Sequence, residues 1–126
     1  MKTIREEKTK MLENMKSKFY ATAFPVNDVE VFKKRLEQTR SDNPKAKHVI
    51  YAYRIGMNSK SCDDKEPKGT AGRPILELLM KKELVNAAII VVRYYGGVQL
   101  GAGRLLRTYL NSAINVLNEC EIIEGE

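Results

Sequence analysis

The sequence predicts a single α+β domain. Its 126 residues suffice for one hydrophobic core and are too few for two, and 43% hydrophobic with 30% charged residues is ordinary for a chain that folds. Apolar residues alternate with a period of two in some segments and recur every three or four residues in others, so strands and helices follow one another. Neither an internal repeat nor a Gly-, Ser- or Pro-rich linker interrupts them.

The first expected elements are a strand and a helix. Residues 1–16 are charged with scattered apolar positions, which suits a peripheral strand and a frayed arm equally. A strand is expected over 18–26, where aromatic and other β-compatible residues alternate. Asn27 or Asp28 can then cap a helix, because apolar residues recur at helical spacing until Pro44, and a proline disfavours helix in the residue before it.

The middle of the chain predicts a strand, a long loop and a second helix. Residues 48–55 are apolar on both alternating faces, as in a strand that is covered on both sides. Residues 56–69 are polar and charged, and a loop of that length is either mobile or functional. Gly72 and Pro74 open an amphipathic helix that ends near 81–83, since proline is tolerated in a first turn whose amides lack partners.

The last third predicts a central strand and the longest helix. Residues 86–93 form an apolar run rich in β-branched side chains. A glycine-rich connection leads from this strand straight into a long helix with apolar residues at helical spacing. The organisation expected from these patterns is an arm or peripheral strand over 1–17, a domain over 18–120 and an acidic tail over 121–126.

Charge and cysteine content narrow the classes of partner. The 22 Lys and Arg residues exceed the 16 Asp and Glu residues, and the resulting net charge of +6 favours an anionic partner. No stretch approaches the ~20 apolar residues that span a bilayer, and the N-terminal segment is too charged for a signal peptide, so we expect a cytoplasmic protein without a membrane partner. Cys62 and Cys120 are expected as free thiols. We expect no cofactor.

The glycine-rich connection is the strongest candidate binding site. Glycines allow close approach of the backbone to a ligand, and a helix N-terminus presents unpaired amides with partial positive charge. No acidic residue occurs from Leu84 to Asn118, so arginines there reinforce an anion site. The candidate anion- or RNA-binding residues are Lys68, Arg73, Arg93, Gly96, Gly97, Gly101, Gly103, Arg104 and Arg107. A tight strand-to-helix turn explains the same glycines equally well, because Ala102 stands where a phosphate loop needs Lys.

The polar loop offers weaker candidates for catalysis. His48, Asp64 and Glu66 could share acid and base work, or with Asp63 bind a divalent metal. The alternative is a solvated charge run in a turn, and since lysines interleave with the acids we expect no metal site. Cys62 with His48 resembles a thiol nucleophile and its base in residue type only.

Four tyrosines could stack nucleic-acid bases. Tyr94 and Tyr95 follow Arg93 at a strand end, and Tyr51 and Tyr53 share one face of another strand. Core packing is the competing interpretation, and we expect at least two of the four to be mainly structural.

Three motifs carry a resemblance to a known family. The segments AKHVIYAYRIG, DDKEPKGTAGRPILELL and VVRYYGGVQLGAGRLLRTY, in this order, resemble the signature blocks of the IMPACT N-terminal domain family, whose bacterial members are called YigZ-like. The resemblance extends from about Lys18 to about Ala113. It implies a two-layer α+β fold with a mixed sheet and helices on one face, similar to the second domain of ribosomal protein S-five, the GHMP kinases and the fourth domain of elongation factor G.

The resemblance also bears on function. Eukaryotic members of the family regulate translation under amino-acid starvation through partner binding, and bacterial members usually carry a further C-terminal domain. This chain departs from the family pattern at Lys65 and Lys68, where glycine and a small residue are common. The added positive charge favours an anion over a metal ion at this loop.

These observations lead to one principal functional hypothesis and two alternatives. The principal one is a non-catalytic binding domain for RNA or the ribosome, with a role in translation regulation or stress response. The alternatives are an enzyme acting on a small phosphorylated or carboxylated substrate, in which His48 and Glu66 point into a pocket between the two glycine-containing blocks, and a module that binds a protein partner. The oligomeric state is left open.

Overall fold

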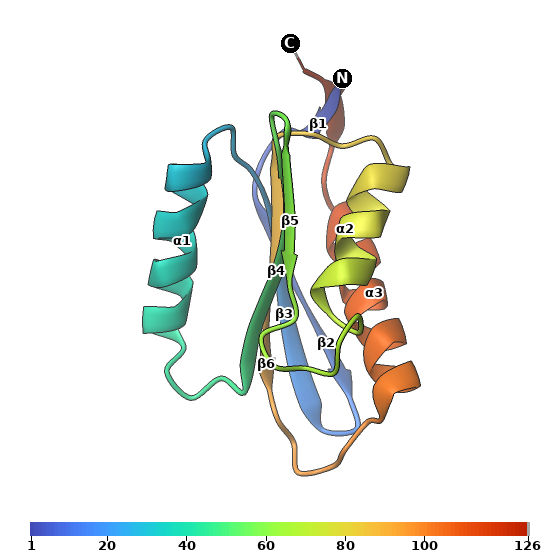
Figure 1. Cartoon of the computed structure of the whole chain (residues 1–126). Coiled ribbons are helices and arrows are strands. Elements are labelled where there is room, and N and C mark those ends of the chain that lie inside the picture. Colours follow the sequence, from blue (N-terminus) through green and yellow to red (C-terminus); the bar gives the residue numbers. More distant parts are fainter. Residues whose placement is uncertain (126) are drawn as a thin grey trace.

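The computed structural model describes residues 1–125, in which a twisted five-stranded sheet stands between helices (Figure 1). Glu126, part of the expected acidic tail, lies outside the described residues. The strands are β1 (Lys2–Ile4), β2 (Lys8–Asn14), β3 (Ser17–Pro25), β4 (His48–Ile55), β5 (Asn58–Cys62), β6 (Ala87–Tyr94) and β7 (Ile122–Glu124). The helices are α1 (Val29–Asp42), α2 (Gly72–Lys81) and α3 (Ala102–Asn118).

The main sheet has the strand order β2-β3-β6-β4-β5, and each neighbouring pair is antiparallel. The central strand is β6, and its residues from Ala87 to Arg93 are all buried, as its apolar run predicts. β1 and β7 form a separate antiparallel pair near the two ends of the chain (Figure 1).

One strand lies where a loop was expected. β5 occupies part of segment 56–69 and pairs with β4 at the edge of the sheet. Its residues are polar and at most half-buried, so hydrophobic periodicity carries no signal for it. The backbone hydrogen bonds to β4 define this strand, and they do not depend on side-chain pattern.

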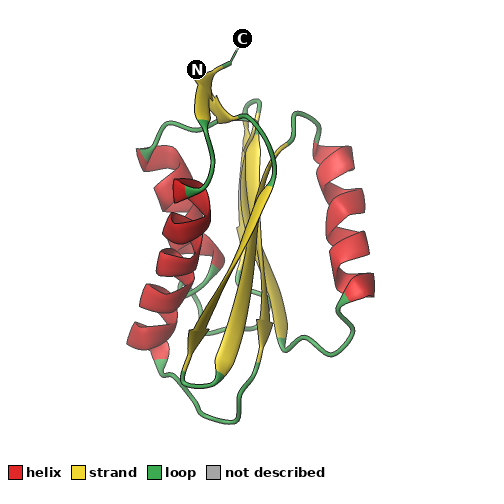
Figure 2. Ribbon diagram, turned by 180° about the vertical axis from the view of Figure 1, so that it is seen from behind, coloured by secondary structure: helices red, strands yellow, loops and turns green. Residues whose placement is uncertain are grey.

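The helices cover both faces of the sheet: Figure 2 shows α1 on one side and the other two helices on the opposite side. One cluster of buried side chains joins α1 to β4 and β6, and a second joins α2 and α3 to the other face. The α+β class is confirmed. The structure corrects two details of the expected arrangement. The strands of the main sheet are all antiparallel and not mixed, and helices cover both faces and not one, because β4 and β6 are apolar on both faces and each face needs a covering layer.

The elements of the α1 face form as the sequence predicts. The Asp28 side chain caps α1 by accepting hydrogen bonds from the amides of Glu30 (2.7 Å) and Val31 (3.4 Å). Phe32 packs on the rings of Tyr51 and Tyr53 with centroid distances of 5.1 and 4.7 Å. Tyr51 and Tyr53 are thus buried core residues and are not available to stack on a base.

Two further observations concern the whole described chain. Both Cys62 and Cys120 are free thiols. Within residues 1–125, no helix combines the length and the apolar character needed to cross a membrane.

Gly96 and Gly103 differ in whether the structure has room for a side chain at their positions. Gly96 lies against the β2–β3 turn, where an added Cβ would overlap the backbone carbonyl of Lys16. Gly103 is exposed in the first turn of α3, where a Cβ would approach only the flexible Arg107 guanidinium, at 3.5 Å. We expect Gly96→Ala to lower the free energy of unfolding by about 1–3 kcal/mol and Gly103→Ala to leave it unchanged or raise it by up to about 1 kcal/mol. Urea denaturation measures both, and a Gly96→Ala protein as stable as the parent would contradict the packing role.

Candidate functional site

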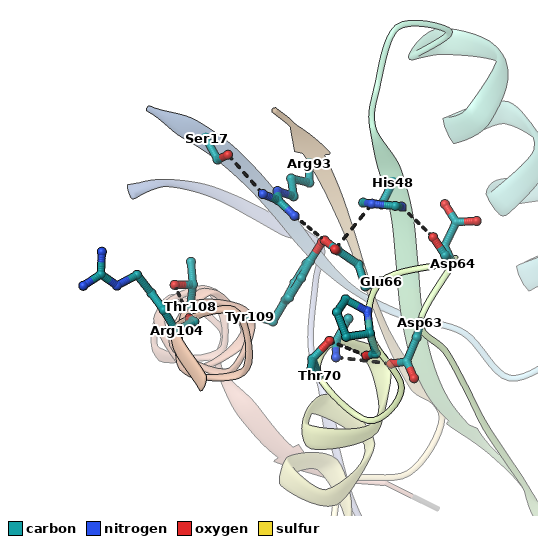
Figure 3. A network of polar contacts seen from close by, with 12 residues as sticks. Ser17, His48, Asp63, Asp64, Glu66, Thr70, Arg93, Arg104, Thr108 and Tyr109 are labelled. Atoms are coloured by element: carbon teal, nitrogen blue, oxygen red, sulfur yellow. Dashed lines mark hydrogen bonds and ion pairs between the residues drawn. The ribbon is translucent and has the colours of Figure 1, made fainter. Parts of the chain in front are cut away.

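The centre of the candidate site is a buried ion pair between Glu66 and Arg93. Glu66 comes from the loop between β5 and α2, and Arg93 from the end of β6. Their side chains are 3% and 5% exposed, and Arg93 Nη1 lies 2.7 Å from Glu66 Oε2. The Tyr109 hydroxyl of α3 donates to the same carboxylate oxygen at 2.5 Å (Figure 3). The pair therefore joins a loop, a strand and a helix around one carboxylate.

Arg93 also reaches the β2–β3 turn. Its Nη2 donates to Ser17 Oγ at 3.3 Å, and the same hydroxyl accepts the amide of Gly96 at 3.2 Å. The guanidinium carbon lies 5.4 Å from the ring centroid of Phe19. Within the described residues, the buried Arg93 Nε has no hydrogen-bond acceptor. The guanidinium is thus fixed by the fold but retains one unused donor.

His48 faces the other oxygen of the same carboxylate. Its Nδ1 lies 2.5 Å from the backbone carbonyl of Asp64, and since a carbonyl only accepts, Nδ1 carries the hydrogen. Nε2 is then directed at Glu66 Oε1, 3.4 Å away. The Asp64 carboxylate accepts the amide of Val49 at 2.7 Å, which ties the loop to the start of β4.

Asp63 shapes the same loop. Its carboxylate accepts the amides of Gly69 (2.8 Å), Ala71 (3.2 Å) and Gly72 (2.9 Å). The N-cap residue of α2, Ala71, has no side chain that can accept these amides, so the carboxylate of Asp63, which lies earlier in the chain, caps the helix instead. The three acids of the loop are thus engaged by N–H and O–H donors. No group of three or more His, Cys, Asp or Glu side chains suited to a metal occurs within residues 1–125.

A cleft of about 330 Å³ lies beside this cluster. It is lined by Lys47, His48, Glu66, Pro67, Arg93, Tyr95, Gln99, Leu100, Gly101, Ala102 and Leu105. Helix α3 starts at its wall: Gly101, with φ of 79°, precedes the helix, and no side chain caps the first amides. Glu66 is the only acid among these lining residues, and Arg93 neutralises it. The uncapped amides and Lys47 therefore make the cleft favourable for an anion.

The predicted site residues divide into two groups. The cleft brings together His48, Glu66, Arg93 and Gly101. Asp64 supports the cleft through His48. The other predicted residues lie outside it: Gly96 packs on the β2–β3 turn, Gly97 has φ of 90° in the connection to α3, and Lys68, Arg73, Gly103, Arg104 and Arg107 are exposed.

The exposed arginines differ in their surroundings. Figure 3 shows Arg104 directed away from Glu66 and Arg93. Arg73 lies 3.7 Å from the Glu77 carboxylate, one turn along α2. Arg93, which the sequence groups with them, is internal and ion-paired. The predicted arginines thus do not converge on one ligand.

Some site residues carry little sequence signal. Tyr109 sits among the apolar residues of α3, and its fully buried hydroxyl needs a partner, which is the one hint available from sequence. Lys47 precedes β4 and stands 5.5 Å from the ring centroid of Tyr95, which is 44% exposed. Ser17 begins β3 and is fully buried. Ser17, Arg93 and Lys47 lie near one another because strand pairing brings the start of β3, the end of β6 and the start of β4 to one end of the sheet.

The fold and the site together define the class of this protein. It is a three-layer α+β domain with a buried arginine–glutamate pair beside an uncapped helix N-terminus. The chain belongs to the Impact N-terminal domain family, whose sequence pattern matches residues 15–117. The resemblance drawn from the three motifs is thereby confirmed.

Individual relatives agree with this membership. The IMPACT family member YvyE of Bacillus subtilis is 35% identical over 125 residues, 97% of this chain and 58% of its own length. The IMPACT family member YigZ of Escherichia coli is 37% identical over 83% of this chain and 55% of its own length. A crystal structure of a protein described as hypothetical is 31% identical with a TM-score of 0.92, covering 97% of this chain and 62% of that one. The chain thus spans a little over half the length of these relatives.

Tyr109→Phe tests the hydroxyl that completes the ion pair. Burial, followed by the hydrogen bond to Glu66, raises the pKa of Tyr109. At neutral pH we expect the variant to lose about 1.5–3 kcal/mol of unfolding free energy, the usual range for a hydrogen bond to a charged group, whereas Tyr20→Phe, at an exposed position, changes little. Above about pH 10 this tyrosine ionises in the unfolded chain and not in the folded chain, so the parent loses stability. The difference in unfolding free energy between the parent and Tyr109→Phe therefore becomes smaller. Urea denaturation from pH 7 to 11 measures it; a pH-independent gap would contradict the assignment.

Substitutions of Lys65, which stands where glycine is common in the family, test whether the backbone is strained at this position. Its φ of 67° lies in the left-handed region, which glycine adopts without steric cost. We expect Lys65→Gly to be more stable than Lys65→Ala by roughly 1 kcal/mol, although both variants remove the same charge. Thermal or urea denaturation compares them, and an alanine variant at least as stable as the glycine variant would contradict backbone strain at this position.

Proposed function

We propose that this domain is a non-catalytic binding domain that engages RNA or a ribonucleoprotein in the cytoplasm and acts in translation regulation. The observation that carries the proposal is the distribution of charge at one end of the molecule. Six exposed basic residues lie on the cleft wall or on the segments that adjoin it, and we call them the basic end: Lys16, Lys47, Lys68, Arg73, Arg104 and Arg107.

The basic end is assembled by contacts between distant segments. Lys16 lies in the β2–β3 turn against Gly96, and the turn is held to α3 by Asn14, whose side-chain amide donates to Thr108 Oγ1 at 2.8 Å. Lys47 and Lys68 flank the cleft from the segments before β4 and before α2. Arg104 and Arg107 occupy the first turns of α3.

These cations are free to meet phosphates. Of the six, only Arg73 has a carboxylate within 4.0 Å among the described residues, at 3.7 Å from Glu77. Of the nearby loop acids, Glu66 is paired with the buried Arg93, and Asp63 and Asp64 are held by backbone amides and form no ion pair with these cations among the described residues. Exposed lysines and arginines without partners attract a polyanion through release of its counterions. The family resemblance to translational regulators makes RNA the polyanion of choice.

The cleft itself also has the geometry of the enzymatic alternative, because His48 and Glu66 both line it. A general base needs a carboxylate oxygen that is free to take a proton. Here one oxygen of Glu66 accepts from Arg93 and Tyr109, and the other faces His48. The two internal donors on one oxygen hold the carboxylate in place and disfavour its taking a proton, which supports binding over proton transfer.

Arg104 and Arg107 provide the test. With fluorescently labelled single-stranded RNA, we expect micromolar or weaker affinity by anisotropy that falls steeply between 50 and 200 mM salt, as for phosphate-dominated binding. The Arg104→Gln/Arg107→Gln double variant should bind more weakly, with the slope of log affinity against log salt reduced by about 1.4, because two phosphate contacts are lost.

The matched control removes the same charge from the opposite face. Lys34 and Arg40 are exposed on α1, and Lys34→Gln/Arg40→Gln should bind RNA with nearly the parental slope. Absent or salt-independent binding, or an equal loss in the control, would refute the proposal. Recovery of a protein partner from nuclease-treated extract, together with absent RNA binding, would favour the protein-interaction alternative.

A further inference from the structure

We infer that the cleft is a pocket for a terminal phosphate monoester, separate from the exposed arginines that meet internal phosphodiesters. The inference deepens the proposed function and rests on it where the monoester is an RNA end. The same chemistry could also come from a free phosphorylated compound, so the experiment includes both sources.

The first argument is size. A volume of about 330 Å³ is at the lower end of the range for small-ligand sites. A cavity of this size holds a phosphate group together with one small attached body. A polymer that follows the surface past Arg104 and Arg107 would place only its end in the cleft.

The second argument is the set of donors. The first amides of α3 beside Gly101 have no capping side chain, so they are available to phosphate oxygens. Independently, Arg93 lines the cleft with a side chain only 5% exposed, and its Nε has no acceptor within the described part of the chain. A buried cation with an unused donor is costly unless a further acceptor arrives. A phosphate in the cleft would place its oxygens on the amides of α3 and its charge beside the Arg93 guanidinium; Nε is closed to solvent in this structure, so a phosphate oxygen reaches it once the side chain turns toward the cleft.

The third argument is charge. A phosphate monoester carries about −1.5 to −2 charges at neutral pH, because its second pKa is near 6, whereas an internal diester carries one. The cleft presents Lys47 and Arg93 against the single carboxylate of Glu66, and the N-terminus of α3 adds roughly half a positive charge. The excess of positive charge favours the more highly charged ligand.

The remaining walls suit the body attached to the phosphate. Pro67, Leu100 and Leu105 provide apolar surface. Tyr95 offers a half-exposed aromatic ring at the mouth, next to Lys47. A sugar with a planar ring matches this combination of apolar and aromatic surface.

Ala102 allows the pocket to be blocked without harming the helix. It is exposed in the first turn of α3, where an acidic side chain is favourable to the helix dipole. Ala102→Glu therefore places a carboxylate at the anion site and should fold. Ala102→Gln has nearly the same shape without the charge and serves as the matched control.

The experiment compares two labelled RNAs of the same sequence, one with a 5′-phosphate and one with a 5′-hydroxyl, together with uridine 5′-monophosphate as the free ligand. We expect the parent to bind the 5′-phosphorylated RNA about tenfold more tightly, the equivalent of about 1.4 kcal/mol. Ala102→Glu should abolish this preference and Ala102→Gln should keep it. Arg104→Gln/Arg107→Gln should lower the affinity for both RNAs and leave the ratio of the two affinities unchanged. Uridine 5′-monophosphate should bind the parent and not Ala102→Glu.

The outcomes separate this inference from the proposed function. Salt-dependent RNA binding with no preference for the 5′-phosphate refutes the terminal-phosphate pocket and leaves RNA binding intact. Binding of uridine 5′-monophosphate that Ala102→Glu abolishes, in a protein that binds neither RNA, supports the pocket for a free phosphorylated compound and refutes RNA binding. An equal loss of the 5′ preference in Ala102→Gln and Ala102→Glu also refutes the pocket, because the charge would then have no role.

Discussion

The buried ion pair between Glu66 and Arg93 is the interaction around which this domain is arranged. It joins the loop before α2 to the central strand, and through Tyr109, Ser17 and His48 it also reaches α3, the β2–β3 turn and β4. Such a pair adds little net stability over well-packed apolar residues, because two charges are desolvated, yet loss of one partner is costly because the other charge is left buried. Its value here is geometric, since it fixes five segments relative to one another.

The pair also decides how charge is divided between interior and surface. The acids of the loop after β5 are turned inward, onto backbone amides, His48 and Arg93. The bases around them, such as Lys47, Lys68 and Arg104, stay in solvent. The loop therefore presents its lysines to solvent while its acids are bound by internal donors. This division underlies the proposed preference for a polyanion.

The glycine-rich connection serves two purposes that sequence alone merges. Gly96 allows close packing on the Lys16 backbone, and Gly101 adopts a left-handed φ that starts α3 at the cleft wall. The strand-to-helix turn therefore accounts for Gly96, whereas the anion site that we propose involves Gly101. Both depend on the position of the connection beside the end of β6, where Arg93 is fixed.

The sequence by itself determined the elements with strong hydrophobic periodicity: α1, α2, α3 and the strands β3, β4 and β6 agree with it closely, because burial of one face imposes a period. It also determined the family and the overall excess of positive charge. The sequence also indicated that β4 is covered on both faces, but only the tertiary structure decided that the sheet is antiparallel, that polar β5 is a strand, and that Arg93 is internal while Arg104 is exposed. Backbone pairing and long-range contacts decide these features, and neither leaves a periodic trace in the order of the residues.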